Sequence, residues 1–215
     1  MMKSRLILMT ALCLCSLTTW AEQVVVQTKN STLVIDAEKG QQAKYVYYGN
    51  RLSTDELSHL QTPVEGRMDV YPAHGLNTPA EAALAMCHGD GNLSTALVVD
   101  GIERSGDITT IRLKDTVYPT EVALKYQART DEDIIEMWTE ITNNEKQTVT
   151  LTTFASAMLP IRRGNVWLSS LYGSWANEAQ LCEEPVTAGQ KVIINKDGTR
   201  NAHTSHGEVM FSLDG

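Results

Sequence analysis

The stretch from Tyr118 to Leu159 alternates apolar and polar residues with a period of two. Side chains of a β-strand point to alternate faces, so this pattern is typical of antiparallel strands with one buried and one solvated face. The connectors at 130–133 and 143–146 contain Asp and Asn, which favour turns. We therefore predict a three-stranded meander whose buried rows are Val122, Leu124, Tyr126 and Ala128; Ile135, Met137 and Ile141; and Val149, Leu151, Ala155, Ala157 and Leu159.

Short apolar segments elsewhere predict further strands, and the one at 107–114 is expected to pair with the strand that follows it. Ser53 and Glu56 have the spacing of a capping box for a brief helical turn that reaches Leu60. Many short strands with turns between them indicate an all-β sandwich, and no linker divides it. The other predicted strands cover 24–27, 32–37, 43–48, 93–100, 166–171 and 191–195, and a long loop covers 61–92.

Residues 1–21 have the pattern of a secretory signal peptide. Lys3 and Arg5 precede an apolar run from Leu6 to Leu17, and small residues before and at Ala21 predict cleavage after it. The apolar run is shorter than the roughly 20 residues needed to span a bilayer. We expect a secreted or periplasmic mature chain that has no membrane partner.

The formal net charge of −8 limits the partners of the chain. The mature chain is more acidic still, because the predicted leader contains Lys3 and Arg5 and no acid. Nucleic acid and anionic membranes are polyanions, so such a surface argues against both. A neutral ligand such as a sugar is compatible with it.

No catalytic set emerges from the residues alone. Ser205 and His206, with Asp197 or Asp214, suggest a nucleophile and a base, but adjacent strand residues point to opposite faces. The carboxylates at 131–133 lie in a predicted turn, and solvation of a turn explains them. We therefore predict no catalytic residue in this chain.

Metal and cofactor sites are not predicted either. His203 and His206 lack a third ligand, and Cys-rich metal motifs are absent from the sequence. Cys87 and Cys182 remain after removal of the leader. In an oxidising compartment a disulfide between them and two free thiols are both compatible with the sequence.

Trp138 falls on the face of its strand opposite Met137. Either a second layer covers that face, or Trp138 is an exposed platform for a sugar ring. Phe154 and Met158 lie on the similarly placed face of the next predicted strand. The sequence therefore predicts that exposed apolar area is concentrated around these three residues.

Four short motifs occur in a fixed order and together suggest a family. They are Tyr71-Pro72-Ala73-His74-Gly75 with Pro79 and residues 82–84; His88-Gly89-Asp90-Gly91; residues 171–178, which read LYGSWANE; and residues 197–206. They resemble "YPxxG…PA", "xxDGS", "LxGxWAxE" and "SRRGxSSH" of family 36 glycoside hydrolases, the α-galactosidases.

The resemblance implies that residues 22–215 are one N-terminal antiparallel β-supersandwich of the galactose mutarotase-like type. In that family a (β/α)8 barrel follows and carries the two aspartates that hydrolyse terminal α-galactosides with retention. We therefore expect a non-catalytic fragment of a larger multidomain chain. Its partners would be its own C-terminal barrel and an α-galactoside or other glycan, and a homo-oligomer is compatible with this assignment.

The resemblance also points to a sugar-proximal loop. In the family a segment with the pattern "GxGDFRxPA" carries an aspartate at the rim of the sugar site. Thr78 stands at the corresponding place here, beside Asn77. We expect Asn77 or Thr78 to hydrogen-bond a sugar hydroxyl, while a different specificity and a purely structural loop remain open.

Two other readings share the sandwich fold. One is a self-sufficient carbohydrate-binding module, which would bind sugar without any further domain. The other is a mutarotase-like epimerase, which requires a His and a Glu that converge in one cleft, with His74 and His88 as the candidate histidines.

Overall fold

The computed structural model of the chain describes residues 22–63, 68–75, 81–161, 164–195 and 205–213. The chain divides after Pro160 into two compact units, residues 1–160 and 161–215, and each is described by itself. Twelve strands and one short helix make up the regular structure of the described residues. The expected all-β class is confirmed.

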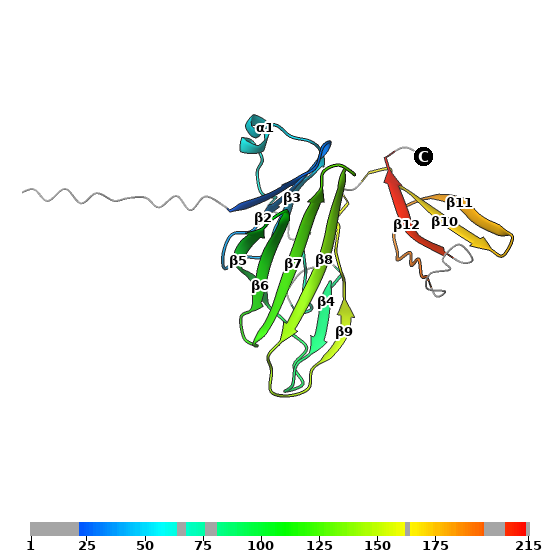
Figure 1. Cartoon of the computed structure of the whole chain (residues 1–215). Helices are drawn as coiled ribbons and strands as arrows, with labels where there is room; N and C mark the ends of the chain where they lie inside the picture. The colour runs from blue at the N-terminus through cyan, green and yellow to red at the C-terminus, as the bar shows by residue number, and fades with distance from the viewer. Residues whose placement is uncertain (1–21, 64–67, 76–80, 162–163, 196–204, 214–215) are drawn as a thin grey trace, which may run out of the picture. The chain divides into compact units, whose positions relative to one another are not determined.

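The first unit contains three antiparallel sheets (Figure 1). One has the order β1-β2-β3, one the order β5-β6-β7-β8, and one pairs β4 with β9. The strands are β1 (Gln23–Gln27), β2 (Ser31–Asp36), β3 (Lys44–Asn50), β4 (Leu84–Cys87), β5 (Leu97–Ser105), β6 (Ile108–Asp115), β7 (Thr120–Arg129), β8 (Ile134–Asn143) and β9 (Thr150–Phe154).

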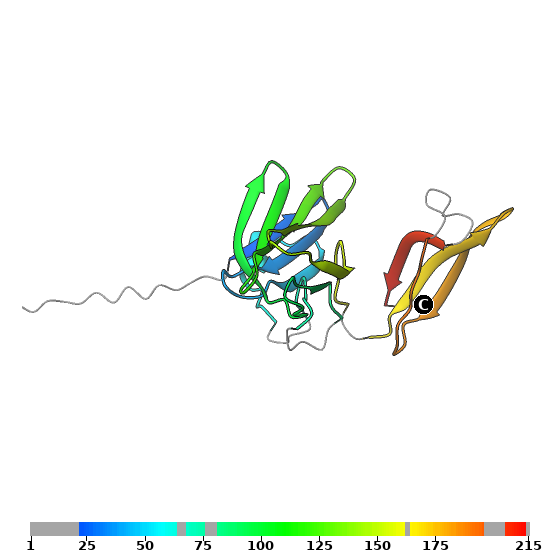
Figure 2. The same ribbon diagram turned by 90° about the horizontal axis from the view of Figure 1, so that it is seen from below.

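The core of this unit lies between the β1–β3 sheet and the β5–β8 sheet (Figure 2). Val24 and Leu33 from the first sheet and Ile111 and Leu124 from the second belong to one buried cluster. Burial of apolar surface between two sheets is the main stabilising term of a sandwich. The central strand β2 is buried on both of its faces, with Val34 opposite Leu33.

The pattern predicted for the strand now called β7 is confirmed. Val122, Leu124 and Tyr126 are buried, and β6 pairs antiparallel with β7, the strand that follows it, as expected. Met137 and Ile141 on β8 pack partly buried against the same cluster. Alternation is reliable here because both strands are long and one face of each is continuously covered.

The third predicted strand is present as β9, and Val149 and Ala155 pack partly buried against the core, but its predicted place in the meander is wrong. β9 pairs with β4, not with β8, so the segment belongs to a different sheet. Leu151 and Leu159, predicted to be buried, are 40% and 53% exposed. The β4–β9 ladder has a register shift between Ala85 and Met86, and such a shift breaks the period of two.

The boundaries of the neighbouring loop also differ from the prediction. β4 falls inside the stretch 61–92 that was expected to be a loop, and β5 begins at Leu97, after the predicted start at residue 93. β4 has only four residues, so its alternation of buried Leu84 and Met86 is too short to be distinguished in the sequence.

The helical turn is confirmed as α1 (Thr54–Ser58). The Ser53 hydroxyl accepts a bond from the Glu56 N–H, and the Glu56 carboxylate accepts one from the Ser53 N–H at 2.8 Å. The bond from the Ser53 backbone holds the pKa of Glu56 below its ordinary value. The reciprocal bonds of the capping box thus satisfy the N-terminus of a helix that has only five residues.

The second unit is a sheet of order β11-β10-β12, with β10 (Trp167–Ser174), β11 (Asn177–Pro185) and β12 (Ser205–Ser212). The strand predicted at 191–195 is wrong, and β11 was not predicted. β11 contains Asn, Glu, Gln and Ala, which have low strand propensity, so pairing with β10 rather than composition forms it. The connecting turn places Ala176 at φ +62°.

Candidate functional site

The loop from Tyr71 to Leu84 is closed at its base by backbone hydrogen bonds. The Ala83 N–H donates to the Pro72 carbonyl at 2.7 Å, and the His74 N–H donates to the Leu84 carbonyl at 2.8 Å. Pro72 and Leu84 are buried. The two ends of the loop are therefore held side by side in the sandwich.

The β9 end of the fold secures the same base. The Tyr71 hydroxyl donates to the Ala155 carbonyl at 2.9 Å, and the Ala155 N–H donates to the Ala83 carbonyl at 2.8 Å. Burial raises the pKa of Tyr71, so its hydroxyl stays protonated as a donor. The predicted sugar-proximal residues Asn77 and Thr78 lie outside the described residues.

The start of the loop presses closely on the segment before β5. Gly75 has φ +98°, and a Cβ at this position would lie 2.6 Å from the Cα of Ser94. The Thr95 N–H donates to the His74 carbonyl at 2.9 Å. Only glycine meets both the backbone angle and the close approach, so Gly75 fixes the direction in which the loop leaves the sandwich.

A polar network centred on His88 holds Thr95 in place. His88 is 2% exposed, its Nδ1 is 2.8 Å from Glu145 Oε1, and its Nε2 is 3.0 Å from Thr95 Oγ1. Glu145 also accepts a bond from the Gly89 N–H at 3.0 Å. These bonds, first that with His88, hold the pKa of Glu145 below its ordinary value. An ionised carboxylate only accepts, so Nδ1 carries the proton.

Tyr118 closes the network from the solvent side. Its ring stacks on His88 with centroids 3.6 Å apart and an interplanar angle of 11°. Its hydroxyl donates to Asp90 at 2.8 Å and accepts from the Asn92 amide at 2.9 Å. The Asn92 N–H, together with Tyr118, holds the pKa of Asp90 below its ordinary value. The turn at 88–92 is thereby fixed on both sides.

The pair of His88 and Glu145 is the convergence that an epimerase would require. However, the His88 ring is buried, and both of its nitrogens already have partners within the protein. No ring atom is left to exchange a proton with a substrate. His74 is exposed, and its backbone forms two bonds: its N–H donates to the Leu84 carbonyl and its carbonyl accepts from the Thr95 N–H. The geometry therefore favours a structural role for this pair.

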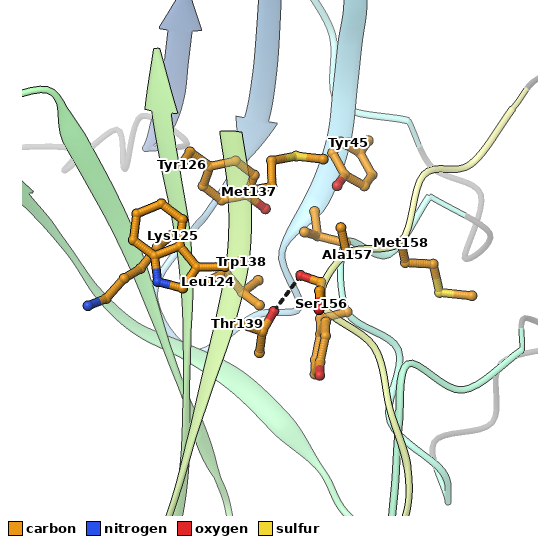
Figure 3. A pocket seen from close by; sticks show the side chains of 12 residues that line it. Tyr45, Leu124, Lys125, Tyr126, Met137, Trp138, Thr139, Ser156, Ala157 and Met158 are labelled. Atoms are coloured by element: carbon orange, nitrogen blue, oxygen red, sulfur yellow. Dashed lines mark hydrogen bonds between the residues drawn. The ribbon is translucent and has the colours of Figure 1, made fainter. Parts of the chain in front are cut away.

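Trp138 lies beside a narrow cleft between β8 and the segment that follows β9 (Figure 3). The Lys125 ammonium lies 5.9 Å from the centroid of its ring, and the indole N–H donates to Glu140 at 3.2 Å. The cavity volume of about 10 Å³ holds one water molecule at most. Because Lys125 already occupies one side of the indole and the cleft is this small, Trp138 is not an open platform for a sugar.

The predicted apolar patch is only partly present. Phe154 is 67% exposed, as expected. Trp138 and Met158 are partly buried, and Met158 packs against the core of the first unit, so the prediction is wrong for these two. Figure 3 shows Met137 near Tyr45, on the opposite side of the strand from Trp138.

The carboxylates at 131–133 lie in a turn, as predicted. Asp131 and Glu132 are exposed, whereas Asp133, at φ +59°, accepts bonds from the Thr28 hydroxyl at 2.5 Å and from the Asn30 N–H at 2.9 Å. The last of the three therefore ties the β7–β8 turn to the β1–β2 hairpin.

The remaining candidates add no chemistry. Ser205 and His206 begin β12, and His203, Asp197 and Asp214 lie outside the described residues. Cys87 on β4 and Cys182 on β11 are free thiols, both partly buried. Across the described ranges, no three His, Cys, Asp or Glu side chains are arranged to hold a metal ion.

Within the described part of the chain, no helix is long and apolar enough to cross a membrane.

The roles of Glu145, Thr95 and Tyr118 were not predicted. Glu145 is 57 positions from His88 in the chain, and its neighbours in sequence read only as a turn. Pairing over such a distance leaves no local signal.

The chain matches the family described as the glycosyl hydrolase family 36 N-terminal domain over residues 41–212. Similar solved structures include an α-galactosidase from Lactobacillus brevis (TM-score 0.73, 17% identity, 89% of this chain and 31% of that chain). They also include the family 36 α-galactosidase AgaA from Geobacillus stearothermophilus (0.75, 15%, 87% and 31%). A third is the galactosidase domain of an α-galactosidase–sucrose kinase, AgaSK (0.75, 21%, 91% and 32%).

The chain spans about a third of the length of these solved structures. A search of curated proteins finds no match. At these identities the structural likeness shows the sandwich fold, while the family match covers most of the sequence. The chain therefore belongs to the N-terminal domain family of the family 36 glycosyl hydrolases.

Proposed function

We propose that this chain is the non-catalytic N-terminal domain of an exported α-galactosidase-type glycoside hydrolase. It supports the catalytic (β/α)8 barrel and shapes the entrance to the barrel's sugar site through the loop from Tyr71 to Leu84. The observation that carries the proposal is the fixed base of this loop, with both ends hydrogen-bonded in the sandwich. A preorganised base lets a loop present Asn77 and Thr78 at low entropic cost.

The substrate class follows from the relatives. Structures of the Geobacillus stearothermophilus enzyme AgaA, as variants, have been solved in complex with raffinose and with stachyose. By this analogy the parent protein hydrolyses terminal α-galactosides. In the proposed arrangement the two reacting aspartates belong to the barrel, and this domain supplies no reacting group.

The first test compares two forms of the protein. One is the chain from Glu22 to Gly215, and the other is the same chain extended into the following barrel. We expect hydrolysis of a nitrophenyl α-galactoside only by the extended form. Turnover by the shorter chain would overturn the non-catalytic assignment, and an inactive but folded extended form would overturn the enzyme class.

The second test addresses the loop in the extended form. Loss of one hydrogen bond to substrate costs about 0.5–1.5 kcal/mol, so Asn77→Ala with Thr78→Ala should raise KM roughly threefold to tenfold. Thr148→Ala, an exposed threonine away from the loop, is the matched control. An unchanged KM in the double variant would show that the loop does not reach the sugar.

The third test concerns export. Expression with the complete leader should give a processed protein in the periplasm or medium whose N-terminus is Glu22. N-terminal sequencing that finds residue 1 or another start, or retention in the cytoplasm, would contradict the predicted leader.

A further inference from the structure

The outer face of the β5–β8 sheet contains a hollow with a cavity volume of about 320 Å³. It lies over β5, β6, β7 and β8, on the face opposite the buried row of Val122 and Leu124. The volume falls at the lower end of the roughly 300–1,000 Å³ that is typical of ligand pockets. The cleft beside Trp138, by comparison, has a cavity of about 10 Å³.

The hollow exists because of one small residue. Ala123 lies in the outward row of β7 between Glu121 and Lys125, and its partners across the sheet are Arg112 on β6 and Glu140 on β8. The four neighbours have long side chains, so the methyl group of Ala123 leaves a depression between them. Ala123 is the floor of the hollow.

Four of the charged groups in the walls of the hollow form two ion pairs. Arg112 donates to both carboxylate oxygens of Glu103, at 2.7 and 3.0 Å, and Lys125 lies 2.8 Å from Glu140. The bond from Arg112 holds the pKa of Glu103 below its ordinary value. Bidentate pairing orients both planar groups, and it leaves carboxylate lone pairs to accept from a ligand and guanidinium N–H groups to donate to it.

These walls select a ligand by its charge and polarity. An apolar partner would desolvate the ion pairs without replacing their contacts with water, which is unfavourable. An ionic ligand would meet groups of both signs, since Glu121 adds a third carboxylate to the two cations. A neutral ligand with many hydroxyls satisfies the walls, and the hydroxyls of Ser105 and Thr142 at the edge match it.

We propose that this hollow is a binding site for a neutral oligosaccharide, with one hexose unit seated over Ala123. The site is separate from the loop of Tyr71 to Leu84 and lies on the opposite side of the β5–β8 sheet from the buried core. The choice of a sugar among neutral polyols rests on the proposed function. The description of the hollow itself is independent of that function. A domain built in this way would hold a glycan near the enzyme without acting on it.

The test uses raffinose as the probe and the chain itself as the protein. Titration is followed by calorimetry and by amide chemical shifts, which locate the bound sugar. Ala123→Trp fills the hollow, and Arg112→Ala removes one wall. Arg129→Ala is the matched control, because it removes a similar Arg–Glu pair, with Glu136 at 3.0 Å, on the same face outside the hollow.

We expect raffinose to shift amides of β6, β7 and β8, and Kd to rise by about tenfold or more in the first two variants, equivalent to about 1.4 kcal/mol. The Arg129→Ala variant should bind as the unsubstituted chain does. Absence of binding, or equal affinity in all three variants, would overturn the proposal. Because binding is measured without a barrel, an inactive extended form would refute the proposed function and leave this result intact.

Discussion

Replacement of His88 by alanine tests whether the buried network stabilises the first unit. The substitution removes the bonds to Glu145 and Thr95 and the stacking on Tyr118. At about 1 kcal/mol for each hydrogen bond and about 1 kcal/mol for the ring contact, the free energy of unfolding should fall by about 3 kcal/mol. The Thr95 side chain, which is fully buried, would also be left without its partner.

Urea unfolding followed by tryptophan fluorescence measures this loss. In a background with Trp167→Phe and Trp175→Phe and without the leader, Trp138 on β8 is the single reporter of the first unit. Thr95→Val, which keeps the shape and removes the hydroxyl, should cost about 1 kcal/mol. The double variant should lose less than the sum of the two losses, because one bond is shared.

Two outcomes would refute the reasoning. A fall of less than about 0.5 kcal/mol in the free energy of unfolding of His88→Ala lies within the range of ordinary surface substitutions. It would mean that the network contributes no net stability. Strict additivity of His88→Ala and Thr95→Val would mean that the bond between them contributes nothing. A change in the slope of the urea dependence would instead point to an altered unfolded state.

Three further predictions follow from the same structure. Gly75→Ala should destabilise the chain by more than about 1 kcal/mol, because alanine is strained at positive φ and its Cβ would contact Ser94. A melting temperature no lower than that of the parent chain would contradict this. Burial raises the pKa of Tyr45 to about 12 from 10.0, so the stability present below pH 10 should fall by about 3 kcal/mol as the pH rises towards 12. Titration of the phenolates should show one tyrosine fewer ionising above pH 11 in Tyr45→Phe than in the parent chain. Identical titration curves would contradict the raised pKa of Tyr45. The pKa of Glu145 is lowered from 4.5, so the stabilisation by its carboxylate is present above pH 4.5 and is lost as the pH falls through the lowered pKa. Glu145→Gln should therefore flatten this part of the acid unfolding curve. An unaltered curve would refute the pairing with His88.

Local patterns predicted the parts of the fold that depend on neighbours in sequence. The buried row of Val122, Leu124 and Tyr126 and the cap formed by Ser53 and Glu56 are both correct, because each is decided within ten residues. β9 was assigned to the wrong sheet because the alternation of apolar residues in a strand does not identify the strand with which it pairs. The expectation of one domain over residues 22–215 remains a prediction.

The candidate site shows the same limit. The resemblance located the loop of Tyr71 to Leu84, since its motif is contiguous, and the structure shows that its base is closed. The network of His88, Glu145 and Tyr118 was not predicted, because its members come from three distant segments that meet only in the folded chain. Chemical type alone does not reveal that a histidine will be buried with both nitrogens satisfied.

The bonds that the Asp133 carboxylate accepts from Thr28 and Asn30 have a consequence for the order in which the fold is completed. The first hairpin is made early in synthesis, yet the residue that ties it to the rest of the sandwich lies 103–105 positions later. Contacts of such high sequence separation form late, because a long loop must close first. The N-terminal strands therefore lack this contact until the β7–β8 turn has been synthesised, a delay that would suit the proposed export of the chain.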